Sequence, residues 1–248
     1  MFNYIKAELY KSFNRMYFWM FTGVMVALGL IVTIVSKSNN LSGVSLSMLL
    51  DTTLFVLSMP VFILACIVDM ITAEENKHQT MRNVITFGVP RHKIILSKLI
   101  VSVILAFIAA FITLTAFYGS AAVLFGIDEG VAVVLPKVAT RLLAAVPLWM
   151  GAISIGTFLG MAINSNTLFS LAYAGTFFLT SKIIFVLSYF VSEKFTELNK
   201  YLITTRLAGL KAPNLTSSEL WTSALIGLAY TVAFAVISML YFNKKEVK

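Results

Sequence analysis

The chain alternates long apolar runs with short polar segments. Six runs hold about 20 or more mostly apolar residues, the length that an α-helix needs to cross a bilayer. They are much longer than the strands of a membrane barrel, and they lack strict alternation. The pattern therefore predicts an all-α membrane protein with six transmembrane helices, at about residues 17–35, 49–73, 99–125, 142–162, 168–191 and 220–242.

Composition supports this prediction. Of the 248 residues, 59% are hydrophobic and 12% are charged, whereas soluble domains are about 45–50% apolar and about 25% charged. The mean hydropathy of +0.90 excludes a soluble enzyme and a disordered regulator. Cys66 is the single cysteine, which excludes a domain held by intrachain disulfides. In a membrane protein, the net charge of +8 indicates basic loops that face anionic lipid and cytoplasm rather than a nucleic-acid partner.

Basic residues in the loops predict the orientation of the helices. Cytoplasmic loops carry an excess of Lys and Arg. With the N-terminus inside, 11 basic residues lie on the cytoplasmic side and 7 on the outer side, and Lys182 falls within the fifth helix. The distribution therefore favours a topology with both termini in the cytoplasm.

The first sixteen residues have the pattern of an amphipathic helix. At about 100° per residue, Phe2, Ile5, Leu9, Phe13 and Met16 fall on one face, with Glu8, Lys11 and Arg15 opposite. Such a helix is suited to lie in the inner headgroup layer; the simpler alternative is a basic flank that only sets topology. We expect an interfacial helix over residues 1–16, followed by a transmembrane domain over residues 17–248.

The segment between the second and third apolar runs contains a further short helical pattern. Met81, Val84 and Ile85 form an apolar stripe, and Gly88 and Pro90 can end the helix. The apolar side chains of a short cytoplasmic helix must be shielded from water, either by the membrane surface or by a protein partner. The acidic pair Glu74–Glu75 could bind that partner or basic residues of the chain itself, such as Arg82 and Arg91.

In order and spacing, these features resemble the ABC-2 type permeases, the membrane subunits of one class of ATP-binding-cassette exporters. The resemblance covers nearly the whole chain: the N-terminal AELYKSFNR stretch, six spans, acidic residues that close span two, Thr80 and Arg82, Pro90–Arg91, and a lysine that opens span three. Many members carry Gly-Thr where this chain has Gln79-Thr80.

The resemblance implies a division of labour between subunits. A cytoplasmic ATPase subunit would bind ATP and Mg²⁺, and a second permease subunit, identical or different, would complete the path in a bacterial plasma membrane. The exported substrate would be a peptide antibiotic or another amphiphilic compound, with a role in antibiotic resistance. The short helix would dock in a groove of the ATPase through residues that match the family's coupling helix: Thr80, Met81, Arg82, Val84, Ile85 and Phe87.

The chain itself lacks the motifs of an enzyme. A P-loop needs a glycine followed by lysine, and none of the 13 glycines is followed by one. The two histidines lack the spacing of a zinc site. We therefore expect no catalytic residues, no metal and no cofactor in this chain.

Three ionisable residues fall within the predicted spans. Asp51 and Asp69 lie near the two ends of the second span, and Lys182 lies in the fifth. Ionisable groups at membrane depth suggest a functional site, although all three are close enough to an end to reach the headgroups. A polar site formed by them would favour the alternative function, an ATP-independent secondary transporter or channel.

Overall fold

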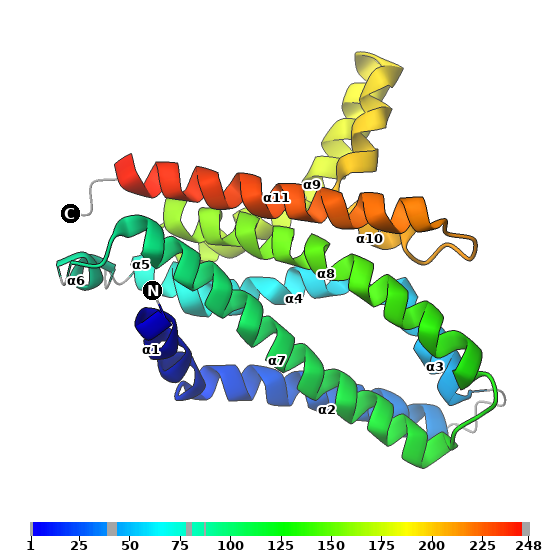
Figure 1. Ribbon diagram of the computed structural model, residues 1–248. Coiled ribbons are helices and arrows are strands. Elements are labelled where there is room, and N and C mark those ends of the chain that lie inside the picture. Colours follow the sequence, from blue (N-terminus) through cyan, green and yellow to red (C-terminus); the bar gives the residue numbers. More distant parts are fainter. Residues whose placement is uncertain (1, 39–43, 78–80, 87, 245–248) are drawn as a thin grey trace.

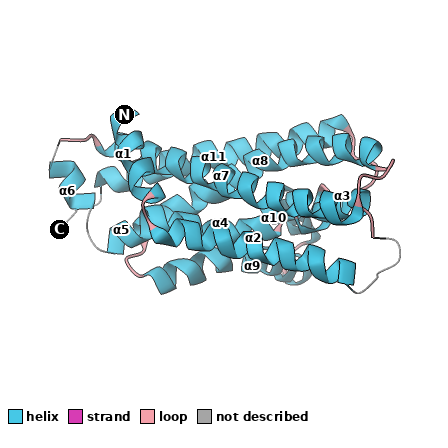
Figure 2. Cartoon of the chain, turned by 90° about the horizontal axis from the view of Figure 1, so that it is seen from below, coloured by secondary structure: helices cyan, strands magenta, loops and turns pink. Residues whose placement is uncertain are grey.

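The computed structural model describes residues 2–38, 44–77, 81–86 and 88–244. Within these ranges the protein is built of helices and contains no strand. Long helices lie side by side in a bundle (Figures 1 and 2). Five of them are long and apolar enough to cross a membrane by themselves: α2 (Met16–Ser38), α7 (Arg91–Phe125), α8 (Val131–Ala162), α9 (Asn166–Phe190) and α11 (Ser217–Lys244). The chain is therefore a multi-pass membrane protein.

Two of these helices begin earlier than the sequence predicted. Helix α7 starts at Arg91 rather than at residue 99, and α8 starts at Val131 rather than at residue 142. The apolar runs missed these first turns because they include basic residues: Lys98 in α7, and Lys137 and Arg141 in α8. Helical backbone continues through these residues, and the side chains of Lys98 and Arg141 are buried.

The second predicted span is a broken helix. One half comprises α3 (Leu46–Thr53) and a 3₁₀ turn, η1 (Leu54–Val56). The other half comprises α4 (Met59–Val68), a π-helical turn, η2 (Asp69–Ala73), and α5 (Glu74–Lys77). The halves meet at an angle of 68°, just before Pro60, whose missing N–H weakens the helix at this point.

This broken helix runs the full length of the bundle. At its start, the backbone N–H of Ser47 donates to Asp128 Oδ1 at 3.0 Å in the loop between α7 and α8, and hydrogen bonds from Ser47 lower the pKa of Asp128. At its end, Glu75 forms an ion pair with Lys98, near the opposite end of α7. The two halves therefore form one interrupted span, which makes six crossings. We refer to the two ends of the bundle as the Asp128 end and the α1 end.

Helices α8 and α11 approach each other more closely than ordinary side chains allow. A Cβ atom added to Gly227 would lie less than 3.0 Å from the backbone of Pro147 and Leu148. The hydroxyl of Ser154 also donates to the carbonyl of Thr231 at 3.0 Å. Small residues permit such close contacts between membrane helices. The small residues Ala152, Gly156 and Gly160 of α8 likewise pack within this chain.

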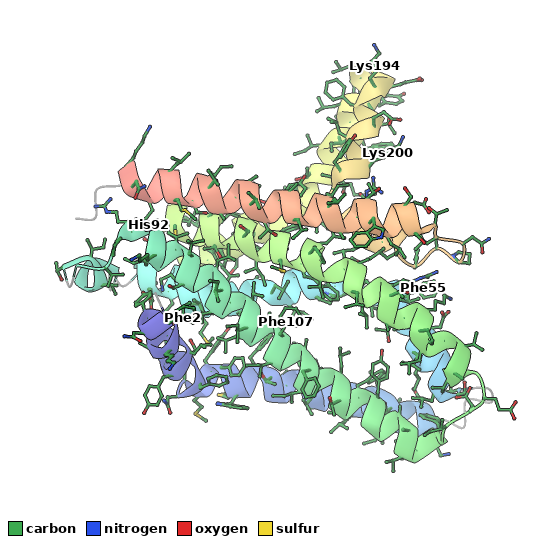
Figure 3. The ribbon with its side chains drawn as sticks, in the orientation of Figure 1. Phe2, Phe55, His92, Phe107, Lys194 and Lys200 are labelled. Atoms are coloured by element: carbon green, nitrogen blue, oxygen red, sulfur yellow. The ribbon has the colours of Figure 1, made fainter. Side chains whose placement is uncertain are left out.

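The second half of helix α9 projects out of the bundle. Phe169, Tyr173 and Phe177 are buried, and beyond them the helix extends outward together with a 3₁₀ helix, η3 (Glu193–Tyr201), that folds back on it. Lys194 and Lys200 lie on this projecting arm (Figure 3). Helix α10 (Ile203–Gly209) then returns to pack on α8.

The predicted N-terminal helix is present as α1 (Phe2–Phe13). Its apolar face is divided: Ile5, Leu9 and Phe13 pack on the core of the bundle, whereas Phe2 is 82% exposed. On the polar side of this helix, Glu8 is buried. The reason is a group of charges contributed by other helices.

Candidate functional site

A cluster of four charged side chains connects three helices at the α1 end of the bundle. Lys98 of α7 has no exposed surface, and Glu75 of α5 is nearly as buried. Lys98 forms an ion pair with Glu75, and its Nζ lies 3.8 Å from a carboxylate oxygen of Glu8 in α1. Lys11 of α1 forms a second ion pair with Glu75. We call Glu8, Lys11, Glu75 and Lys98 the charged cluster.

The π-helical turn η2 supplies two further acceptors for cations. Lys98 Nζ donates to the carbonyl oxygen of Ile71 at 2.8 Å. Arg15, between α1 and α2, donates to the carbonyl oxygen of Met70 at 2.9 Å and to Glu74 at 2.6 Å. A π turn displaces carbonyl groups from the regular helical ladder and is frequent at functional sites. Here the displaced carbonyls bind cationic side chains from two other elements.

Because Lys98 and Glu75 are buried, their ion pairs and hydrogen bonds contribute to the stability of the bundle. An unpaired charge in a low-dielectric environment is costly, so a buried Lys requires compensating partners. Beside the cluster, burial and the neighbouring Glu8 carboxylate raise the pKa of Tyr4, so its phenol stays protonated. The cluster therefore joins α1, α5 and α7 into one unit whose members cannot separate without exposing or isolating a charge.

Glu74 and Glu75 form ion pairs inside the chain. Glu74 pairs with Arg15, and Glu75 pairs with Lys11 and Lys98. Arg91 donates to the carbonyl oxygen of Phe242 at 2.8 Å, at the end of α11. The acidic pair therefore helps to hold the bundle together at this end.

The short helix expected after the second span is α6 (Met81–Thr86). Gly88 follows it with a φ of +81°, and its N–H donates to the carbonyl of Ile85 at 2.9 Å, which confirms the predicted left-handed end. Val84 and Ile85 are half-buried and pack on a small core formed by Ile94, Ile95, Met161 and Phe242. The chain itself thus covers part of the surface of Val84 and Ile85.

The remaining residues of the predicted coupling segment are only partly described. Thr80 and Phe87 lie outside the described residues. Met81 and Arg82 lie in α6; on a helix whose Val84–Ile85 side faces the bundle, position 86 lies on the opposite face and position 82, one turn before it, lies at the edge of that face. Thr86 is exposed. Any docking surface of α6 is therefore the face that carries positions 82 and 86.

The three ionisable residues of the predicted spans do not come together. Asp51 pairs with Lys137 at 2.7 Å at the Asp128 end. Asp69 lies at the other end, with Oδ2 3.5 Å from the amide nitrogen of Asn166. Lys182 is exposed on α9. Among the residues that the structure describes, no three His, Cys, Asp or Glu side chains are grouped as metal ligands.

Sequence reasoning missed the charged cluster because Lys98 was assigned to the flank of a span. A lysine at the edge of an apolar run usually extends to the headgroups. Two signals pointed elsewhere: Lys98 follows a full helical turn that contains Ile94 and Ile95, and Glu8 and Lys11 share one side of an N-terminal helix. Asn76 was also missed; its amide donates to the carbonyls of Met161 and Ile163 at the end of α8.

Comparison with known proteins identifies one family. The sequence profile described as "ABC-2 family transporter protein" matches residues 4–181. This match includes most of α1, then α2, the broken span, α6, α7, α8 and the first part of α9, and therefore the whole charged cluster. A comparison with curated proteins finds no match.

Proposed function

Because the chain belongs to the ABC-2 family of transporter proteins, we propose that it is the permease subunit of an ATP-driven exporter. A membrane subunit of this family is a transport component that associates with an ATP-binding subunit. In this proposal the ATPase subunit carries ATP and Mg²⁺, a second permease completes the path, and the complex exports peptide antibiotics or other amphiphilic compounds from a bacterial plasma membrane.

The observation that carries the proposal is the attachment of α6 to the bundle. Its inner side packs on residues of α7, α8 and α11, and in this proposal the ATPase contacts its outer face. The charged cluster lies next to this contact and links α7 to α5 and α1. A force that an ATPase applies to α6 would therefore pass to several spans together, as a change of state in a coupled transporter requires.

The second half of α9 supports a permease pair. Phe178, Ile183, Phe185 and Tyr189 are more than half exposed along this arm, which leaves an apolar helix face without a cover in the single chain. Lipid or a second permease would cover it.

The proposal places the α1 end in the cytoplasm, with both termini inside. Cysteines introduced at Ser38 and Asn214 should then react with a membrane-impermeant maleimide added to intact cells, and a cysteine at Lys93 should not. All three positions are exposed in the structure, so access depends on the side of the membrane. The variants carry Cys66→Ala to remove the native thiol, and labelling of Lys93→Cys in intact cells would reverse the topology.

The outer face of α6 should determine binding of the ATPase. We expect Arg82→Glu to reach the membrane at the normal level and to retain less than one tenth of the ATPase that purifies with the wild type. A reversed charge in a protein contact costs affinity through both desolvation and repulsion. The measurement is a pull-down of the tagged permease with quantified membrane content.

Lys93→Glu is the matched control, because it makes the same charge change at an exposed site near the start of α7. It should retain the ATPase. Val84→Asp does not serve as this test, because Val84 packs on the chain's own core and its loss would detach α6. Equal retention of the ATPase by Arg82→Glu and wild type would remove α6 as the docking element.

A further inference from the structure

The break in the second span borders an apolar cavity of about 320 Å³. The cavity lies between α2, the broken span, α7 and α8, and its lining includes Phe21, Pro60, Ala106 and Val146. Pockets for small molecules usually have volumes of about 300–1,000 Å³. The space is thus large enough for a ligand, and its lining includes no residue of the charged cluster or of α6.

The lining offers almost nothing to a water molecule. Only Thr53, Thr113 and Trp149 bring side-chain polar atoms to it. The hydroxyl of Thr53 bonds to the carbonyl of Leu49 and to Tyr118, and the indole N–H of Trp149 donates to the carbonyl of Leu57 at 3.2 Å. Water fills a cavity only where it finds two to four polar partners. An apolar occupant is therefore favoured over water.

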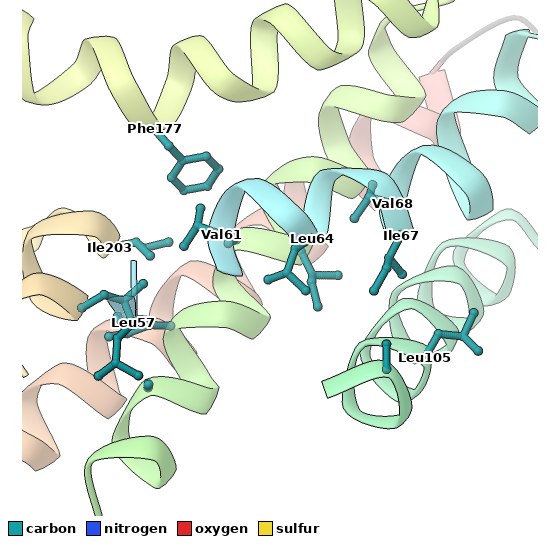
Figure 4. Close-up of a cluster of buried hydrophobic side chains, with 14 of the residues drawn as sticks. Leu57, Val61, Leu64, Ile67, Val68, Leu105, Phe177 and Ile203 are labelled. Atoms are coloured by element: carbon teal, nitrogen blue, oxygen red, sulfur yellow. The ribbon is translucent and has the colours of Figure 1, made fainter. Parts of the chain in front are cut away.

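The bend of the span explains how the cavity arises. Val61 and Val68, on one side of α4, are fully buried, and Val61 points toward Phe177 of α9 (Figure 4). Leu64 and Ile67 point from the opposite side of α4 (Figure 4) and line the cavity. Both α3 and α4 contact α7, but the two halves of the span meet at 68°, and a space remains beside the bend.

The cavity opens toward the bilayer rather than toward water. Three of its lining residues are about half exposed: Val56 at 47%, Met59 at 60% and Phe107 at 49%. Phe107 lies midway along α7 (Figure 3). The opening lies between the Asp51–Lys137 pair at one end and the charged cluster at the other, which places it at the depth of the hydrocarbon core.

We propose that this cavity is a binding site for the alkyl chain of a single-chain amphiphile, which enters sideways from the bilayer. A dry apolar cavity beside lipid loses dispersion contacts unless it is filled, and a chain from the membrane reaches it without crossing a polar layer. Binding itself does not depend on an ATPase. The step from bound amphiphile to exported substrate rests on the function proposed above.

Trp149 provides a direct reporter, because it lines the cavity while the other two tryptophans do not. In a Trp19→Phe/Trp221→Phe background, Trp149 is the single tryptophan, and excitation at the red edge of the absorption band, where tyrosine does not absorb, selects it. The protein is placed in nanodiscs of unlabelled phosphatidylcholine, and stearic acid brominated at mid-chain is added, since bromine quenches fluorescence on contact. We expect quenching that saturates when the probe is a small fraction of the lipid.

Two cavity-filling variants test whether the alkyl chain of the probe binds in this cavity. Ala106→Phe on α7 and Val146→Phe on α8 each place a ring in the space, and each should weaken the apparent affinity for the probe at least fivefold. Matched controls add a ring outside the cavity: Gly119→Phe, where a Cβ meets nothing within 4 Å, and Leu143→Phe, which is 71% exposed. Both controls should bind as the wild type does. Two independent fillers keep the test valid if one fails to fold.

Other outcomes would overturn the proposal. Quenching that rises in proportion to the probe and is equal in all variants would indicate only the contacts of surrounding lipid. Saturable quenching by a brominated two-chain phospholipid, added in the same way, would identify a resident phospholipid instead of a single-chain ligand. The quenching assay contains neither ATP nor an ATPase subunit, and the Arg82→Glu variant should bind the probe as the wild type does. A failure of probe binding can therefore be told apart from a failure of ATPase binding.

Discussion

Replacing Lys98 with methionine should lower the free energy of unfolding by about 3–5 kcal/mol, the usual cost of removing one partner from a buried ion pair. The lysine side chain has no exposed surface and is bonded to Glu75 and to the carbonyl of Ile71. Methionine keeps most of the volume but removes the buried cation that pairs with Glu75. The change should appear as a lower unfolding midpoint in a denaturant titration of the detergent-solubilised protein.

The neighbouring Lys93 supplies the control, because it lies on the same helix and is exposed. Lys93→Met should stay within about 0.5 kcal/mol of the wild type, as surface substitutions usually do. The double variant Glu75→Gln/Lys98→Met removes one charge of each sign and leaves Glu8 and Lys11 to balance each other. It should recover a large part of the loss. A Lys98→Met protein as stable as wild type would mean that the charged cluster does not hold the α1 end together.

Gly227→Ala should also destabilise the protein, by about 1–3 kcal/mol, although alanine normally favours a helix over glycine by about 1 kcal/mol. The added methyl group would fall on the backbone of Pro147 and Leu148. Backbone atoms cannot rotate aside as a side chain can, so α8 and α11 would have to separate. The same denaturant titration measures this loss.

Gly119→Ala is the comparison for this variant. Gly119 also lies within a long membrane helix, but a Cβ at this position meets nothing within 4 Å. Alanine there should be neutral or stabilising. If both glycine variants behaved alike, the close contact between α8 and α11 would not contribute to stability.

The membrane helices could be predicted from sequence because hydropathy alone determines which segments can reside in lipid. The ends of helices were harder, because Lys98 and Arg141 look like flanking residues when only their charge is considered. Both are buried in the structure. Their burial depends on acceptors from other parts of the chain, such as the carbonyl of Pro213 in the loop between α10 and α11, 3.1 Å from a guanidinium nitrogen of Arg141. Periodicity within one helix does not reveal such acceptors.

The candidate site was predictable only where it depends on residues that are close together in the sequence. The sequence indicated α6 and its left-handed end at Gly88, both of which depend on local rules. It did not indicate that Val84 and Ile85 pack inward, or that Glu8 faces Lys98, because these contacts join segments far apart in the chain. The cavity beside Pro60 was not predictable either, since it is formed by four separate elements.

The central claim is that this chain works with an ATPase, and the most direct measurement is ATP hydrolysis by the protein as it exists in its native membrane. The tagged chain is isolated in mild detergent, and its ATPase activity and bound subunits are measured together. We predict ATP hydrolysis that purifies with the chain, due to a separate P-loop subunit, and that is lost with Arg82→Glu but kept with Lys93→Glu. Isolation of the chain without ATPase activity from membranes that still transport would contradict the claim and favour a secondary transporter or channel.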